Sequence, residues 1–192
     1  MNDNVKILHE TETEFLCVWN SPLDSNKYWS DLIDDKASYS QNKTGIRLER
    51  AYCRVYQPSW PYWNNKDFES LEQHMVTKVN TLTEMLGKKK EKRHRLEEGM
   101  WGLVYADQET CGPHGHGKSN HYAGTYYFTA DPGCGSIFFP TIGIEIEPEF
   151  GDLILFNSRL MHGVMPNKFP DAKRICVAFN VPAEKKEEDE PV

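Results

Sequence analysis

Residues 113–117 read Pro-His-Gly-His-Gly, and this stretch decides how the second half of the chain is expected to fold. Side chains of an extended strand alternate between its two faces, so His114 and His116 should project to the same side. A third histidine, His162, closes a second strand-like run that begins at Gly151. Neutral imidazole is a common ligand of zinc, iron, copper and nickel ions. The pattern predicts one metal ion held by His114, His116 and His162; a turn whose histidines only cap backbone groups is the structural alternative.

Length and composition fit a single soluble globular domain. The 192 residues are 39% hydrophobic, with a mean hydropathy of −0.67. No apolar run approaches the roughly 20 residues of a membrane span, and no secretory signal is visible. The five cysteines are scattered without C-x-x-C spacing, which favours a reducing compartment over a disulfide framework or a zinc ribbon. We therefore expect a cytoplasmic protein with no membrane partner.

Charge is unevenly spread along the chain. The net charge is −7, and residues 184–192 are expected to form a disordered acidic tail. There is no clear nucleic-acid signal, although the basic run at 88–95 fits either an exposed helix end or a partner surface.

The Pro- and Trp-rich residues 57–65 either cover a substrate entrance or fill a gap beside the core. No feature specifies an oligomeric state.

Apolar spacing divides the chain into a mixed first half and a β-rich second half. Residues 1–23 and 46–56 alternate as strands do, whereas 24–34 and 67–86 repeat apolar residues at helical spacing. From residue 100 onward about eight short strands are expected, with a turn region at 107–113.

The expected fold class is mostly β with flanking helices. It is a double-stranded β-helix, a cupin-like jelly roll with helices packed outside one sheet. We expect one domain over residues 1–183. In it, residues 1–99 form a supporting layer of helices and strands, and residues 100–183 supply the metal-binding core strands.

The last strand, at 173–181, carries an arginine on an unexpected face. Ile175, Val177 and Phe179 share one side, so Arg174 shares the other with small or polar residues and points into the roll. A buried arginine is costly unless an anion pairs with it. Guanidinium binds carboxylate through two parallel hydrogen bonds, which suits a dicarboxylate co-substrate. A buried acidic partner, or a side chain that reaches the rim, would explain Arg174 equally well.

Four pieces in order make the chain resemble the Fe(II)/2-oxoglutarate-dependent oxygenases. They are HGH at 114–116, GTYY at 124–127, GDLILFNSRLMH at 151–162 and RICVAFN at 174–180. The pattern is most similar to the small 2OG-Fe(II) oxygenases whose first signature reads H-x-H in place of H-x-D. The resemblance spans residues 101–181 and hardly touches the first half.

The resemblance implies a cofactor, a co-substrate and a reaction. Fe(II) would be held by His114 and His162, with His116 where most relatives carry Asp. 2-Oxoglutarate would chelate the metal and place its distal carboxylate on Arg174. Tyr105 stands where related enzymes often place a tyrosine that contacts the co-substrate, and Tyr126 is a second candidate. The implied partners are 2-oxoglutarate, O₂ and an unidentified substrate that is hydroxylated at an unactivated C–H bond.

His116 departs from the usual set of two histidines and one carboxylate. It either binds the metal in a three-histidine site, which we prefer because residues i and i+2 of a strand converge, or stands aside and leaves a position open. In a third alternative, a nearby acid such as Asp107 or Glu109 folds in to complete the set.

Two other functions fit the same sequence. Cupins carry H-x-H, a later Glu and a distant His, and here His121 takes the Glu-like place. A three- or four-histidine cupin metalloenzyme would not use 2-oxoglutarate and would assign no role to Arg174. The other alternative is a non-catalytic jelly-roll binding module or a viral structural protein.

Overall fold

The computed structural model describes residues 4–39, 51–56, 66–87, 100–106, 108–116 and 120–182. The segments at 57–65 and 88–95 and the acidic tail at 184–192 lie outside these ranges, so their predicted roles stay predictions.

Within the described ranges, seven antiparallel strands form the larger sheet, in the order β1-β2-β10-β7-β12-β5-β4. Their bounds are Val5–Glu10 (β1), Phe15–Asn20 (β2), Arg54–Tyr56 (β4), Met100–Tyr105 (β5), Asn120–Ala130 (β7), Asp152–Asn157 (β10) and Arg174–Pro182 (β12). The smaller sheet, as far as the structure describes it, has five antiparallel strands in the order β3-β6-β11-β8-β9. Their bounds are Ala51–Tyr52 (β3), Thr110–His114 (β6), Ile137–Phe139 (β8), Ile144–Ile146 (β9) and His162–Val164 (β11).

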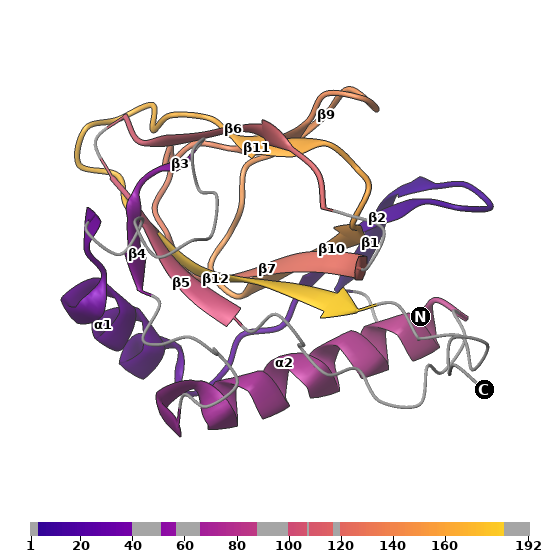
Figure 1. The fold of residues 1–192 in the computed structure, drawn as a ribbon, viewed down its shortest axis with the longest axis horizontal. Helices are drawn as coiled ribbons and strands as arrows, with labels where there is room; N and C mark the ends of the chain where they lie inside the picture. The colour runs from indigo at the N-terminus through magenta and orange to yellow at the C-terminus, as the bar shows by residue number, and fades with distance from the viewer. Residues whose placement is uncertain are drawn as a thin grey trace, which may run out of the picture.

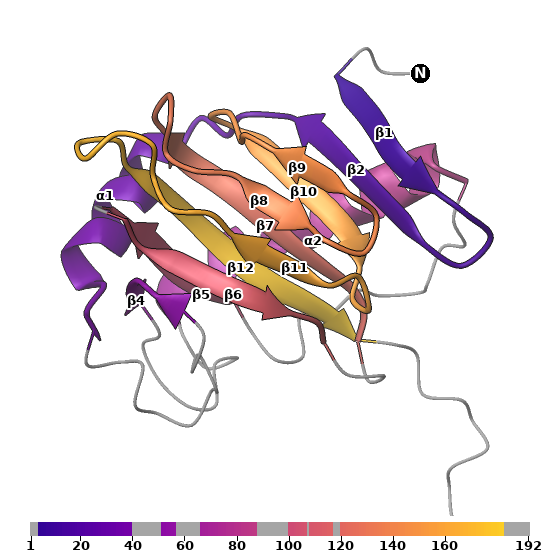
Figure 2. The ribbon, with the colours of Figure 1, turned by 90° about the horizontal axis from the view of Figure 1, so that it is seen from above.

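Three layers result (Figure 1). Helices α1 (Asn26–Lys36) and α2 (Lys66–Met85) cover the outer face of the larger sheet, and the smaller sheet stacks over its inner face. Figure 2, seen from above, shows the strands of the two sheets lying over one another. One core fills the space between helices and sheet, and a second fills the space between the sheets. The predicted jelly roll with helices outside one sheet is confirmed. No helix in the described part of the chain has the length and apolarity needed to cross a membrane.

The side chains of β12 point alternately into the two hydrophobic cores. Ile175, Val177 and Phe179 are buried against the helical layer, whereas Cys176 lies in the core between the sheets. Arg174 shares the face of Cys176, so it points into the roll, as its place in the alternation predicts.

The first half of the chain contributes to both sheets as well as supplying the helices. β2 lies between β1 and β10 inside the larger sheet, and β3 pairs with β6 in the smaller one. The division into a supporting layer over 1–99 and core strands over 100–183 therefore does not describe how the sheets are assembled.

Two local expectations around the histidines need correction. Residues 110–114 form strand β6 and not a turn, because pairing with β3 on one side and β11 on the other outweighs the local Gly112-Pro113 turn signal. His162 does not close the strand at 152–157 either. The chain turns after Asn157, and His162 opens a separate strand in the other sheet.

Gly124 allows β7 and β12 to lie side by side. A Cβ atom at this position would lie 2.4 Å from Cζ of the buried Phe179, which is its cross-strand partner. We predict that Gly124→Ala lowers the free energy of unfolding by about 1–3 kcal/mol, because the ring is enclosed and cannot move aside freely. Urea denaturation measures this, with the exposed Thr141→Ala as control; equal stability of the two variants would contradict the predicted clash.

Candidate metal centre

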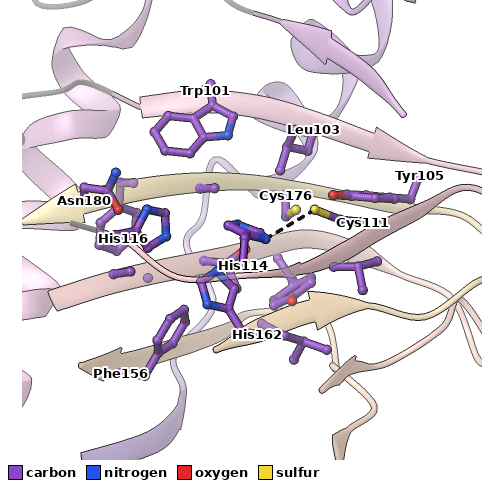
Figure 3. Close-up of a pocket in the computed structure, with 18 of the residues that line it drawn as sticks. Trp101, Leu103, Tyr105, Cys111, His114, His116, Phe156, His162, Cys176 and Asn180 are labelled. Carbon is purple, nitrogen blue, oxygen red and sulfur yellow. Dashed lines mark hydrogen bonds between the residues drawn. The ribbon is translucent and has the colours of Figure 1, made fainter. Parts of the chain in front are cut away.

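Three histidines converge between the two sheets (Figure 3): one ends a strand, one lies in the segment that follows it, and one begins another strand. His114 ends β6 and His162 opens β11, and the two are paired in register across these neighbouring strands. His116 lies two residues beyond β6, where its backbone N–H donates to the Ser158 carbonyl at 2.9 Å. One potential ligand nitrogen from each ring lies within 4.8 Å of the others. The structure therefore brings together all three predicted ligands, although His116 is held by a loop contact and not by a strand.

Backbone hydrogen bonds set which nitrogen of two rings is available. His114 Nδ1 lies 3.0 Å from the Gly112 carbonyl, and His162 Nδ1 lies 2.9 Å from the Leu160 carbonyl. A carbonyl only accepts, so each Nδ1 carries the hydrogen and each Nε2 keeps its lone pair. This arrangement fixes the tautomer and the orientation of metal-binding imidazoles in proteins.

Burial keeps two of the rings neutral. It lowers the pKa of His162 to about 3 and that of His116 to about 4, with a smaller contribution from the neighbouring His114. A metal ion binds the neutral form of imidazole, so these rings are in the ligating form without loss of a proton.

Among the described residues, no carboxylate belongs to the cluster of three histidines. Glu109, one candidate to fold in, is engaged by the Tyr39 hydroxyl and by the Ala106 backbone N–H at 2.8 Å. Asp107, the other candidate, lies outside the described residues. His121, the fourth ligand of the cupin alternative, is not part of the cluster, and its ring centroid lies 4.2 Å from that of Tyr122.

Arg174 is fully buried in the same cavity as the three histidines. Its Nη1 donates to the Gly135 carbonyl at 3.0 Å, and its guanidinium carbon lies 4.4 Å above the Tyr105 ring centroid. Its Nε and Nη2 have no hydrogen-bond partner in the described structure, and no described carboxylate forms an ion pair with it. Both structural explanations therefore fail for the described residues: the side chain does not reach the rim, and it has no buried acid.

The two unpartnered nitrogens have a specific geometry. Nε and Nη2 share one edge of the planar guanidinium, the edge that binds a carboxylate through two parallel hydrogen bonds. A buried donor without an acceptor costs about 1–3 kcal/mol, so an anion that fills this position recovers that free energy. The site thus fits both groups that the sequence implies: a metal ion at the histidines and a carboxylate at Arg174.

The structure places the two predicted tyrosines differently. Tyr105 lines the cavity, and burial raises its pKa, so it stays a neutral phenol. Tyr126 lies on the opposite face of β7, where its hydroxyl donates to Asn26 Oδ1 at 2.9 Å and accepts from the Leu23 N–H at 3.0 Å. The prediction that Tyr126 contacts the co-substrate is therefore corrected, because its side chain lies in the core between the larger sheet and the helices.

Sequence reasoning missed two contributors to the cavity. Tyr127, one residue along, lines the cavity, because it pairs with Cys176 of β12 and shares its face. Gly135 supplies the carbonyl that holds Arg174, and it does so from a turn with a φ of +84°. Tyr127 belongs to the GTYY stretch at 124–127, but only the register of β7 against β12 shows that Tyr127, and not Tyr126, faces the cavity.

Comparisons with known proteins agree with this arrangement. A family model described as "Putative 2OG-Fe(II) oxygenase" matches residues 141–180, a stretch that includes His162 and Arg174. No curated protein matches the chain. The chain is similar to a solved structure of a viral collagen prolyl hydroxylase from Paramecium Bursaria Chlorella virus-1 in complex with 2-oxoglutarate. The TM-score is 0.58 and the sequence identity 15%, and the match covers 90% of this chain and 97% of that one. A prolyl-4-hydroxylase of Pseudomonas putida matches with a TM-score of 0.58 and 13% identity, over 91% of this chain and 95% of its own. At such identities the structural likeness shows the fold, and the family match confirms the resemblance seen in the sequence.

Proposed function

We propose that this chain, which resembles the 2OG-Fe(II) oxygenases in fold and over residues 141–180, is an Fe(II)- and 2-oxoglutarate-dependent dioxygenase. One observation carries the proposal: a buried arginine with two unpartnered nitrogens on one edge lies in the same cavity as three convergent imidazoles. The metal site alone fits many enzymes. Arg174 adds a binding position for a carboxylate, and 2-oxoglutarate has one carboxylate for Arg174 and an oxo-acid end for the metal.

The proposed reaction balances as 2-oxoglutarate plus O₂ plus R–H giving succinate, CO₂ and R–OH. Fe(II), when bound, would supply the O₂ chemistry. His114 and His162 would hold the metal through Nε2, with His116 as the third ligand. Arg174 would bind the distal carboxylate, and Tyr105 and Tyr127 would close the surrounding wall against water.

A three-histidine set changes the charge balance of the site. A carboxylate ligand offsets part of the charge of Fe(II), whereas three neutral imidazoles offset none. The dianion of 2-oxoglutarate would then be the main counter-charge in a buried space where unpaired charges are costly. This supports a dicarboxylate as the partner of the metal.

The direct test is turnover. Incubation of the Fe(II)-loaded protein with 2-oxoglutarate and air is expected to release succinate slowly without a substrate, and faster with members of a substrate panel. Succinate is quantified by mass spectrometry. The proposal fails if iron-loaded protein, with or without the panel, forms no succinate above a metal-free control.

His116 can be tested separately from the other ligands. We predict that His116→Asp retains Fe(II), since carboxylate oxygen is an ordinary iron ligand, while His116→Ala weakens Fe(II) binding at least about tenfold, or 1.4 kcal/mol. Competition with a colorimetric iron chelator measures both. If His116→Ala holds iron as tightly as the parent, His116 is not a ligand.

A three-histidine cupin metalloenzyme remains a second candidate because no described carboxylate joins the cluster. The two candidates differ at Arg174. A cupin that ignores 2-oxoglutarate predicts that Arg174→Met leaves turnover of its own substrate intact, whereas the dioxygenase predicts loss of 2-oxoglutarate binding.

A further inference from the structure

The cavity beside the three histidines carries a positive charge and, among the described residues, no negative one. Arg174 is 0% exposed, and its guanidinium is always protonated in proteins. Apart from Arg174 and the imidazoles, no described residue that lines the cavity has an acidic or basic side chain. Glu109, the carboxylate nearest to His114 in sequence, is not among the lining residues and is engaged by the Tyr39 hydroxyl. A divalent metal ion therefore enters a space that offers it no counter-charge from these residues.

The three imidazoles add no negative charge when they bind the ion. Imidazole ligates as the neutral ring, whereas an aspartate in the same position would remove one unit of charge. His114, His116 and His162 point toward one another (Figure 3), and no described carboxylate joins them. With Fe(II) alone, the two charges of the ion and the one of Arg174 would give three positive charges in the cavity. Burying charges without compensation is unfavourable, because they lose their hydration.

A dicarboxylate changes this balance by two units. 2-Oxoglutarate is a dianion, so it would lower the sum from three positive charges to one. Its oxo-acid end on the metal and its distal carboxylate on Arg174 would place each negative charge beside a positive one. The unpartnered Nε and Nη2 of Arg174 would gain acceptors in the same event. Each ligand thus supplies the counter-charge that the other one lacks when it binds alone.

We propose that this chain loads Fe(II) and 2-oxoglutarate as a coupled pair, so that the 2-oxoglutarate concentration sets how much of the protein holds iron. The inference rests on the proposed function, which assigns both ligands to this cavity. Each ligand raises the affinity for the other by the same factor, as thermodynamic linkage requires. This coupling factor is expected to be at least about 30, or roughly 2 kcal/mol. Its origin is the neutral imidazole of His116 in place of a carboxylate ligand.

The charge of residue 116 can be changed while its size is kept. His116→Asn offers the metal a neutral amide oxygen, and His116→Asp offers a carboxylate oxygen on a side chain of nearly the same size. The carboxylate of His116→Asp compensates one charge of the ion before the dianion binds and then repels the dianion. Its coupling factor should be at least about fivefold smaller than that of His116→Asn, which should stay within about threefold of the parent. Chelation by the oxo-acid is common to both variants, so their difference reports the charge.

Chelator competition without oxygen measures the coupling. Fe(II) affinity is determined for the parent and both variants with and without saturating 2-oxoglutarate, and a protein-free titration accounts for the iron that 2-oxoglutarate itself binds. Calorimetry then gives the 2-oxoglutarate affinity of metal-free and Fe(II)-loaded protein, which must differ by the same factor. Glutarate gives a readout that needs no variant. It has both carboxylates and no oxo group, so at saturation it should still raise the Fe(II) affinity of the parent at least about threefold.

The outcomes separate this inference from the function beneath it. Parent protein that binds 2-oxoglutarate but holds Fe(II) equally tightly with and without it would overturn the coupling. Equal coupling factors in His116→Asp and His116→Asn, or no effect of glutarate on Fe(II) affinity, would overturn its origin in charge. Parent protein that holds Fe(II) and does not bind 2-oxoglutarate at any concentration would instead overturn the proposed function.

Discussion

Replacement of His162 by alanine is expected to weaken Fe(II) binding by at least about 100-fold, or roughly 2.8 kcal/mol. His162 is 7% exposed, and its Nδ1 is fixed by the Leu160 carbonyl, so its Nε2 is preset toward the other two rings. Alanine removes that nitrogen and leaves a space which no described carboxylate is placed to fill. His114→Ala should have a similar effect, because its ring is fixed in the same way by Gly112.

The measurement is chelator competition under anaerobic conditions, with His74→Ala as the control. His74 is exposed on α2, and its Nδ1 lies 2.6 Å from the Ser70 carbonyl, far in sequence from the cluster. The control should bind Fe(II) as the parent does. Parent-like affinity in His162→Ala would show that the metal, if bound at all, is held elsewhere.

The second large effect concerns Arg174. Arg174→Met is expected to lower 2-oxoglutarate affinity at least about 100-fold while Fe(II) affinity stays within about threefold of the parent. Methionine has a similar length but offers no donor to a carboxylate. Arg174→Lys should lie between the two, because an ammonium group attracts an anion without the two parallel hydrogen bonds of guanidinium.

The free energy of unfolding distinguishes a binding role of Arg174 from a structural one. Replacing buried charged groups by apolar side chains can stabilise a protein, by roughly 1–4 kcal/mol where a buried ion pair is replaced. The lost hydrogen bond to Gly135 opposes this by roughly 1–3 kcal/mol. The two effects are similar in size, so Arg174→Met should not lower the free energy of unfolding by more than about 1 kcal/mol. The exposed Arg159→Met serves as the control. A loss of stability with 2-oxoglutarate affinity retained would contradict the assignment.

Alternation along strands made much of the fold and of the site predictable. In β12 the sequence alone separates Ile175, Val177 and Phe179 from Arg174, because the helix-side core needs an apolar face. The three histidines could be predicted because imidazole has few other reasons to recur in this pattern.

What sequence reasoning missed depends on contacts distant along the chain. Tyr126 and Tyr127 are neighbours of similar chemistry, and only the pairing of Tyr127 with Cys176 decides which one faces the cavity. The strand at 110–114 likewise depends on partners about 60 residues before it and 50 after it. Gly135 holds Arg174 through a backbone carbonyl, a group that every residue carries and that no side-chain pattern reveals.

The central claim is that one cavity binds Fe(II) at the three histidines and 2-oxoglutarate between that metal and Arg174. The most direct measurement is an anaerobic titration of 2-oxoglutarate into Fe(II)-loaded protein, followed by visible absorption. Chelation of the metal by the oxo-acid is expected to produce a weak metal-to-ligand charge-transfer band that saturates in the parent and is lost in His162→Ala. Arg174→Met should shift its appearance to at least about 100-fold higher 2-oxoglutarate concentration. No band in parent protein that demonstrably holds Fe(II) would contradict the account.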